Sequence, residues 1–158
     1  MASRCVGFVV AGEDVIVIDT EIPDDADEPI TIVMDATWNL AKGDRGTAYA
    51  TMFQRCGDYL RENKIAKAVI KASALPQSAA KLGLLESAEL RGVIIAACAS
   101  VCETKVLKKA QISRTFGNRK VDEYVKDDGF WDANVEGGKL RKGSREAAMQ
   151  VIAARSRK

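Results

Sequence analysis

The sequence predicts an α/β protein built around a mixed sheet, in which three antiparallel strands precede parallel strands and helices flank the sheet. Two β-branched runs, residues 4–10 and 15–21, are separated by four turn-forming residues, which predicts an N-terminal hairpin. Further along, segments with helical spacing of apolar residues alternate with short buried runs, a pattern typical of helices that return to parallel strands. The chain has 158 residues, so we expect residues 1–158 to form a single domain.

The first three strands follow from the turn and loop signals between them. The connection at residues 11–14, Ala-Gly-Glu-Asp, is short enough for a hairpin turn, so the first two strands are expected to be antiparallel neighbours. Residues 23–29 contain two prolines and four acidic residues, and this composition favours a loop. A third strand is then expected at residues 30–34.

The middle of the chain predicts two helices, each followed by a strand. Residues 46–63 carry apolar side chains at helical spacing, and the apolar run 67–70 predicts a buried parallel strand after this helix. A second helix is expected at residues 79–100, followed by a fifth strand at 105–107. The C-terminal third shows two further helical patterns, at residues 119–126 and 144–155.

The cysteines and the absence of histidine exclude several classes of function. Cys98 and Cys102 lie one helical turn apart, but the four cysteines include no second such pair, so four zinc ligands do not converge in the sequence. We expect the cysteines to be reduced and mostly buried. Because the chain has no histidine, it has no Ser-His or Cys-His dyad, which excludes hydrolysis by a charge relay.

The N-terminal apolar run predicts no membrane segment. Residues 5–10 are apolar before acidic residues follow, and about six residues are too few for a signal-peptide core or a membrane span. We therefore expect a soluble, cytoplasmic protein without a membrane partner.

Four segments, taken in order, resemble the RuvC-like branch of the RNase H-like superfamily, which has a resolvase-type scaffold. They are Val-Gly-Phe-Val at 6–9, Ala-Val-Ile-Lys at 68–71, the apolar helix at 90–97 and the start of the last helix at 142–149. The resemblance covers nearly the whole chain and rests on the order and spacing of these segments. It implies an RNase H-like fold, with the mixed sheet flanked by helices.

The resemblance also implies where metal-binding carboxylates would lie. Family members place an aspartate in the first strand, where this chain has Val9, and a glutamate at the end of the strand after the first helix, where it has Lys71. The last helix normally supplies one or two more carboxylates three residues apart, at positions that hold Glu146 and Met149. Most catalytic acids of the family are therefore missing.

A single carboxylate cannot hold the two metal ions, about 4 Å apart, of phosphodiester hydrolysis. Lys71 would repel a divalent cation and attract a phosphate. The resemblance thus implies a protein that binds nucleic acid without cleaving it and needs no cofactor. Structural interpretations stay open, because Lys71 could be a solvated strand end and Glu146 a first-turn carboxylate favoured by the helix dipole.

Basic residues are concentrated in the second part of the chain. Residues 1–60 contain four Lys or Arg against eleven Asp or Glu, whereas residues 61–158 contain twenty against eleven. Such asymmetry is typical of polyanion binding, although an ordinary solvated surface is the alternative. We expect salt-sensitive phosphate contacts from ten residues: Lys71, Lys105, Lys108, Lys109, Arg114, Arg119, Lys120, Arg141, Lys142 and Arg145.

Other acidic residues leave a displaced metal site open. Asp19 and Glu21 share a face of the second strand, and Asp35 follows the third strand. A further series is formed by Asp122, Asp127, Asp128 and Asp132. If several converged they could hold Mg²⁺ or Mn²⁺, with Glu146 and Asp19 as candidate catalytic residues, although solvated loops and helix caps explain them more simply.

Three hypotheses about function follow. The first is a non-catalytic RNase H-like module that binds nucleic acid, alone or as a subunit of a nucleic-acid-processing assembly. The second is a metal-dependent endonuclease with displaced acidic residues. The third is a homodimer or protein-interaction module, with Trp38, Phe130 and Trp131 as its contact surface.

Overall fold

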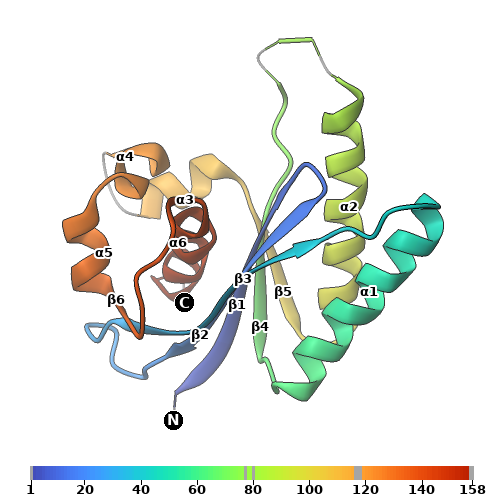
Figure 1. Ribbon diagram of the computed structural model, residues 1–158. Coiled ribbons are helices and arrows are strands. Elements are labelled where there is room, and N and C mark those ends of the chain that lie inside the picture. Colours follow the sequence, from blue (N-terminus) through green and yellow to red (C-terminus); the bar gives the residue numbers. More distant parts are fainter. Residues whose placement is uncertain (1, 77, 80, 116–118, 157–158) are drawn as a thin grey trace.

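The computed structural model describes residues 2–76, 78–79, 81–115 and 119–156, without the side chains of Arg114, Thr115 and Ser156. A central sheet separates two groups of helices (Figure 1). Helices α1 and α2 cover one face of the sheet, and α3 to α6 lie on the other side. No helix in this part of the chain is long and apolar enough to cross a membrane.

The sheet is mixed and has the strand order β5-β4-β1-β2-β3-β6. Strands β1, β2 and β3 are antiparallel neighbours, β4 and β5 continue the sheet in parallel from β1, and β6 is parallel to β3. The predicted fold class is therefore confirmed. The strands are Ser3–Ala11 (β1), Asp14–Ile22 (β2), Ile30–Asn39 (β3), Lys67–Lys71 (β4), Glu103–Leu107 (β5) and Val135–Glu136 (β6).

The long helices lie where the apolar spacing predicted them. Helix α1 begins after Asp44, whose carboxylate caps the helix by accepting a hydrogen bond from the amide of Thr47 at 2.9 Å. The short α3, α5 and β6 were not predicted, because segments of two to seven residues show no full apolar period. The helices are Arg45–Glu62 (α1), Leu82–Ala99 (α2), Lys109–Thr115 (α3), Val121–Val125 (α4), Asp128–Asn134 (α5) and Lys142–Ser156 (α6).

Strand β3 is twice as long as expected and contains an irregularity. It runs to Asn39, where the sequence predicted an end at residue 34, because its second half continues to pair with β2. Asp19 faces Met34 and Thr20 faces Ile32, so Val33 is the extra residue of a β-bulge. The bulge changes which later residues of β3 face α6.

Each face of the sheet has its own apolar core. Val6, Phe8 and Val10 of β1 pack with α1 and α2, whereas Cys5 and Val9 pack with α6. This alternation is the expected consequence of strand geometry. All four cysteines are free, as predicted, and all except Cys102 are buried.

The aromatic contact surface that the sequence suggested for a homodimer is wrong. Trp38 and Trp131 are each only 4% exposed, because Trp38 packs beneath α1 and Trp131 packs within the cluster under α6. Neither indole can form an external contact surface. A protein-interaction role would need another surface.

Candidate nucleic-acid interface

A lysine and a glutamate meet where β4 ends and α6 begins. Lys71 is the last residue of β4, and strand alternation turns Ala68 and Ile70 toward α1 and α2 but Lys71 toward α6. Its Nζ atom lies 2.6 Å from Oε1 of Glu146, which is an ion-pair distance. The side chains are 23% and 24% exposed, so the pair is open to solvent and carries no net charge.

Apolar side chains lie beside this ion pair. Val9 follows Phe8, whose partner in β4 is Ile70, so Val9 and Lys71 lie at the same end of neighbouring parallel strands. Met149, three residues after Glu146, is fully buried in the same apolar cluster as Val9. The ion pair therefore lies at the edge of the apolar core that contains Val9 and Met149.

A glycine lets α6 approach β1 closely. A Cβ atom on Gly7 would lie 2.4 Å from the backbone oxygen of Ala147 in α6. Nearby, Nε2 of Gln150 donates to the carbonyl oxygen of Phe8 at 2.9 Å, while Oε1 of the same amide is buried without a partner among the described residues. This close packing sets the position of Glu146 relative to Lys71.

A second polar contact ties the start of α6 to β3. Asp35 accepts hydrogen bonds from Nη2 of Arg141 at 2.7 Å and from Oγ of Ser144 at 2.6 Å. Burial alone would raise the pKa of Asp35, but the hydrogen bonds from Arg141 and Ser144 outweigh burial and hold it below its usual value. Asp35 is thus ionised and structural at neutral pH.

The lowered pKa of Asp35 predicts a pH-dependent stability. A carboxyl with a depressed pKa contributes stability that is fully present above its unfolded pKa of about 4 and is lost as the pH falls through the folded pKa. Asp35→Asn should lower the free energy of unfolding by about 1 kcal/mol at pH 7. In urea unfolding, this difference should shrink below pH 4, and a difference that grows with acidity would contradict the assignment.

Most of the predicted phosphate contacts are engaged with acidic residues. Within the described residues, Lys108, Lys120 and Lys142 form no ion pair, and the side chain of Arg114 lies outside this part of the structure. Six of the ten form ion pairs: Lys71 with Glu146, Lys105 with Glu103, Lys109 with Asp122, Arg119 with Asp127, Arg141 with Asp35 and Arg145 with Asp128.

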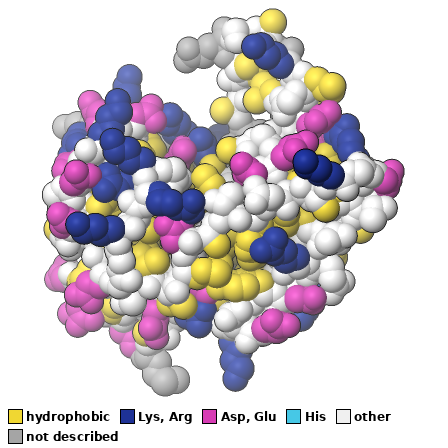
Figure 2. Space-filling view, in the orientation of Figure 1, with side chains coloured by type: hydrophobic (Ala, Val, Ile, Leu, Met, Phe, Trp, Pro, Cys, Tyr) yellow, Lys and Arg dark blue, Asp and Glu magenta, His cyan; other side chains and the backbone are white. Residues whose placement is uncertain are grey.

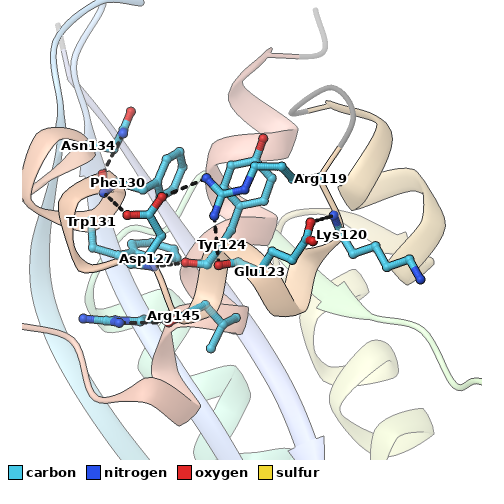
Figure 3. Close-up of polar contacts among 10 residues, drawn as sticks. Arg119, Lys120, Glu123, Tyr124, Asp127, Phe130, Trp131, Asn134 and Arg145 are labelled. Carbon is cyan, nitrogen blue, oxygen red and sulfur yellow. Dashed lines mark hydrogen bonds and ion pairs between the residues drawn. The ribbon is translucent and has the colours of Figure 1, made fainter.

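Two of these arginines hold the short helices α4 and α5 together (Figure 3). The guanidinium of Arg119 lies 4.5 Å from the ring centre of Tyr124 and pairs with Asp127 at 2.8 Å. Arg145 lies 6.0 Å from the ring centre of Trp131 and donates to the carbonyl oxygen of Val125 at 2.8 Å. Both arginines therefore stabilise the packing of α4 and α5.

The surface around α4 to α6 has mixed charge. On the face seen in Figure 2, Lys and Arg side chains on the left are interspersed with Asp and Glu. Lys108 directly follows Leu107, which faces Lys71 across β4 and β5, and Lys142 lies one helical turn before Glu146. Two lysines without ion pairs among the described residues thus lie on segments next to the Lys71–Glu146 pair.

Three solved structures are similar to this chain over most of its length. Thermus thermophilus RuvC has a TM-score of 0.70 at 8% identity, covering 95% of this chain and 92% of that chain. The T. thermophilus RuvC complex with a Holliday junction substrate has a TM-score of 0.68 at 7% identity, covering 96% and 91%. The yeast mitochondrial Holliday junction resolvase Ydc2 has a TM-score of 0.64 at 10% identity, covering 98% and 77%.

The chain has a RuvC-like, RNase H-like fold. The predicted resemblance is confirmed at the level of the fold, although no family model and no curated protein matches the sequence. The four positions where the sequence resemblance implied metal-binding carboxylates lie in the second half of β1, at the end of β4 and on α6. They hold Val9, Lys71, Glu146 and Met149.

These four residues do not fit a divalent cation. Such a cation needs several oxygen ligands, whereas this place offers one carboxylate, and an ammonium lies 2.6 Å from it. Val9 and Met149 contribute no ligand atom for a hard cation. No three Asp, Glu, Cys or His side chains converge on a possible metal position anywhere in the described residues.

The acids of the displaced-site hypothesis lie on opposite faces of the sheet. Asp19 is fully buried on the α1 side, where it is bound by Arg4 and by the hydroxyl of Tyr59. Asp35 pairs with Ile18 and faces α6 instead, because strand positions alternate. The convergence of Asp19 with Asp35 that a displaced metal site would require does not occur, and Glu146 meets Lys71 rather than Asp19.

The buried carboxylate of Asp19 explains a perturbed tyrosine. The pKa of Tyr59 is raised, first by burial and then by its hydrogen bond to Asp19, because both favour the neutral phenol. Tyr59 also contacts Trp38 edge-on, with ring centres 5.5 Å apart. Arg4, Asp19 and Tyr59 thus anchor α1 on the sheet, which is a structural role.

Sequence reasoning missed Arg91 on α2. It lies at the same ends of β1 and β4 as Lys71 but on the α2 side, and its Nη2 donates to the carbonyl oxygen of Val10 at 3.0 Å. One signal was present, because Arg91 is the only charged residue between Leu90 and Ala99. A charged side chain rarely lies within an apolar helical run unless it is paired or makes a functional contact.

Proposed function

We propose that this chain binds nucleic acid at the carboxyl ends of β1, β4 and β5 without cleaving it. The observation that carries the proposal is the Lys71–Glu146 ion pair, which lies in a RuvC-like fold at two positions where the sequence resemblance implies metal-binding carboxylates. A cluster of carboxylates without metal repels a phosphate backbone. The Lys71–Glu146 pair carries no net charge, so a phosphate can approach without a metal ion.

Hydrogen bonding supports the same interpretation. An ammonium group has three donors, and Glu146 needs only one of them, so Lys71 retains donors for a phosphate oxygen. Lys108 and Lys142 lie on segments next to the pair and form no ion pair with a described residue. Contacts of this type follow the backbone and do not select a base sequence.

Branched DNA is the first ligand to test. One similar structure is described as T. thermophilus RuvC in complex with a Holliday junction substrate, and another as a yeast mitochondrial Holliday junction resolvase. We infer from the shared fold that a four-way junction is a reasonable probe beside duplex and single-stranded DNA and RNA. A cytoplasmic location and a single domain over residues 1–158 stay predictions.

The test is a salt series of binding by fluorescence anisotropy, with Lys108→Met and Lys142→Met combined. Each lost phosphate contact should flatten the slope of log affinity against log salt by about 0.9, so the double variant should lose about 2. Lys42→Met combined with Lys64→Met, two exposed lysines near the ends of α1, is the matched control. Equal slopes in both double variants would contradict the interface.

A second candidate function, homodimerisation, is favoured by the exposed face of α2. Leu82 and Leu85 are 68% and 56% exposed, and a shallow apolar groove between α1 and α2 is lined by Phe53, Gly92 and Ala96. The small residues Gly92 and Ala96 allow another helix to approach closely. In a two-fold symmetric dimer, α2 of a second copy would present its own Leu82 and Leu85 to this face. We infer that a second copy covers this face.

The second copy can be tested by light scattering coupled to size-exclusion chromatography. Wild type should elute with twice the 17.1 kDa mass of one chain, and Leu85→Glu should elute as a monomer with unchanged circular dichroism. Glu86→Lys also changes a charge on α2 but leaves both leucines, and it should stay dimeric. A monomeric wild type would remove this candidate.

A further inference from the structure

A cleft lies beside the candidate interface, on the other face of the sheet. It has a volume of about 600 Å³ and lies between the turn after β1 and the first turns of α2. Its lining includes Val10, Gly12, Lys81, Ser87 and Arg91. Two basic side chains, two serines and the start of an 18-residue helix therefore line one cleft.

Arg91 brings an uncompensated positive charge to this cleft. Its Nη1 donates to Oγ of Ser73 at 2.6 Å and its Nη2 to the carbonyl oxygen of Val10, so both partners are neutral. Nε is buried and has no hydrogen-bond partner, and no carboxylate pairs with the guanidinium among the described residues. Burial lowers the pKa of Arg91, because a charged guanidinium is disfavoured away from water when no anion lies beside it.

Ser87 provides an independent second observation. Its side chain is only 5% exposed, it lines the cleft, and it has no hydrogen-bond partner among the described residues. Its Oγ is not among the fully enclosed polar atoms that lack a partner, so the hydroxyl reaches the cleft, where it can donate to a bound ligand. Lys81 lies six residues before Ser87, at the N-cap and without a side-chain hydrogen bond to the helix, and the N-terminal end of the helix dipole also favours an anion.

We propose that this cleft binds a phosphate group, held by Arg91 and Ser87, which lie one helical turn apart on α2, while Lys81 and the start of α2 add positive potential at the other end of the cleft. The inference deepens the proposed function and rests on it: the phosphate belongs to the nucleic acid backbone that crosses the sheet edge. Arg91 binds the carbonyl oxygen of Val10, the residue after Val9, so its cleft adjoins the edge where Lys71 meets Glu146. The nucleic acid backbone would then contact the protein on both faces of the sheet.

The experiment is a titration of ¹⁵N-labelled protein, first with inorganic phosphate and then with a 5′-phosphorylated single-stranded oligonucleotide. The Nε–H signal of Arg91 and the amide of Gly83 report on the cleft. In wild type, both signals should shift saturably with each ligand. Ser87→Ala should weaken phosphate affinity about tenfold, and Arg91→Met should abolish saturation.

Two further variants keep the result interpretable. Ser100→Ala, at the far end of α2, removes a matched hydroxyl and should leave both titrations unchanged. Arg91→Lys retains the charge but lacks the fork of donors, so it should bind phosphate more weakly than wild type and better than Arg91→Met. Urea unfolding of each variant shows which ones keep the fold.

The outcomes separate the two proposals. Oligonucleotide binding that leaves the Arg91 and Gly83 signals unshifted, or that is equal in wild type and Ser87→Ala, would overturn the cleft while the proposed function stands. Saturable phosphate binding at the cleft without oligonucleotide binding would support the phosphate site and overturn the proposed function. Phosphate shifts spread equally over exposed lysines, without saturation, would overturn the site.

Discussion

The variant that combines Val9→Asp, Lys71→Glu and Met149→Asp should bind manganese, whereas the wild type should not. The substitutions place three carboxylates near Glu146, at the positions where the sequence resemblance implies metal-binding acids. Without metal, the repulsion between clustered and partly buried carboxylates should make this variant less stable than wild type. Mn²⁺ at about a hundred times its dissociation constant should restore about 2.7 kcal/mol, seen as a rise in melting temperature.

The control for this variant replaces the same residues with amides, as Val9→Asn, Lys71→Gln and Met149→Asn. It has similar shape but lacks the charge that holds a divalent cation, so Mn²⁺ should not raise its melting temperature. Lys71→Glu alone keeps the apolar Val9 and Met149 and should fold even if the triple variant does not. Its response to Mn²⁺ should be smaller but present, and a wild type stabilised by Mn²⁺ would show that the aligned positions are wrong.

Gly7→Ala should be the most destabilising single substitution near the site. The new Cβ would lie 2.4 Å from the oxygen of Ala147 and 3.1 Å from Cγ2 of Val151, so α6 would have to move away from β1. Overpacking against backbone should cost about 3 kcal/mol, which for a chain of this length lowers the melting temperature by about 10 °C. The shift of α6 should also separate Glu146 from Lys71.

The matched control for Gly7→Ala is Gly83→Ala at the start of α2. No atom lies within 4 Å of the Cβ that this substitution adds, and alanine is a better helix former than glycine. Its melting temperature should equal or slightly exceed that of wild type. If Gly7→Ala unfolds at the wild-type temperature, then α6 does not pack against β1 as closely as described.

The sequence predicted the sheet and the long helices because each has a local signal. The hairpin is marked by residues 11–14, and α1 is marked by buried Ala48, Met52, Cys56 and Leu60 at helical spacing. No local sequence pattern indicated which face of the sheet the side chain of Asp35 occupies. The β-bulge at Val33 depends on the register between β2 and β3, and the pairing of Asp35 with Arg141 joins segments 106 residues apart, so no local pattern encodes either feature.

The candidate site shows the same division. The resemblance implied metal-binding positions at both Lys71 and Glu146, but the ion pair between them was not predicted. The ion pairs of Lys109, Arg119 and Arg145 could not be predicted, because each acidic partner becomes a neighbour only after α3 to α6 have packed. Counting basic residues therefore overestimated the cations that are open for phosphate.

The most direct test of the central claim compares junction binding with and without divalent metal. The affinity of wild type for a labelled four-way DNA junction is measured at equal ionic strength in EDTA and in Mn²⁺, and the DNA is then run on a denaturing gel. Equal affinity in both solutions and intact DNA are the predicted results, because the Lys71–Glu146 pair leaves no need for a metal ion. Binding that requires Mn²⁺, or cleavage products in its presence, would contradict metal-independent binding without catalysis.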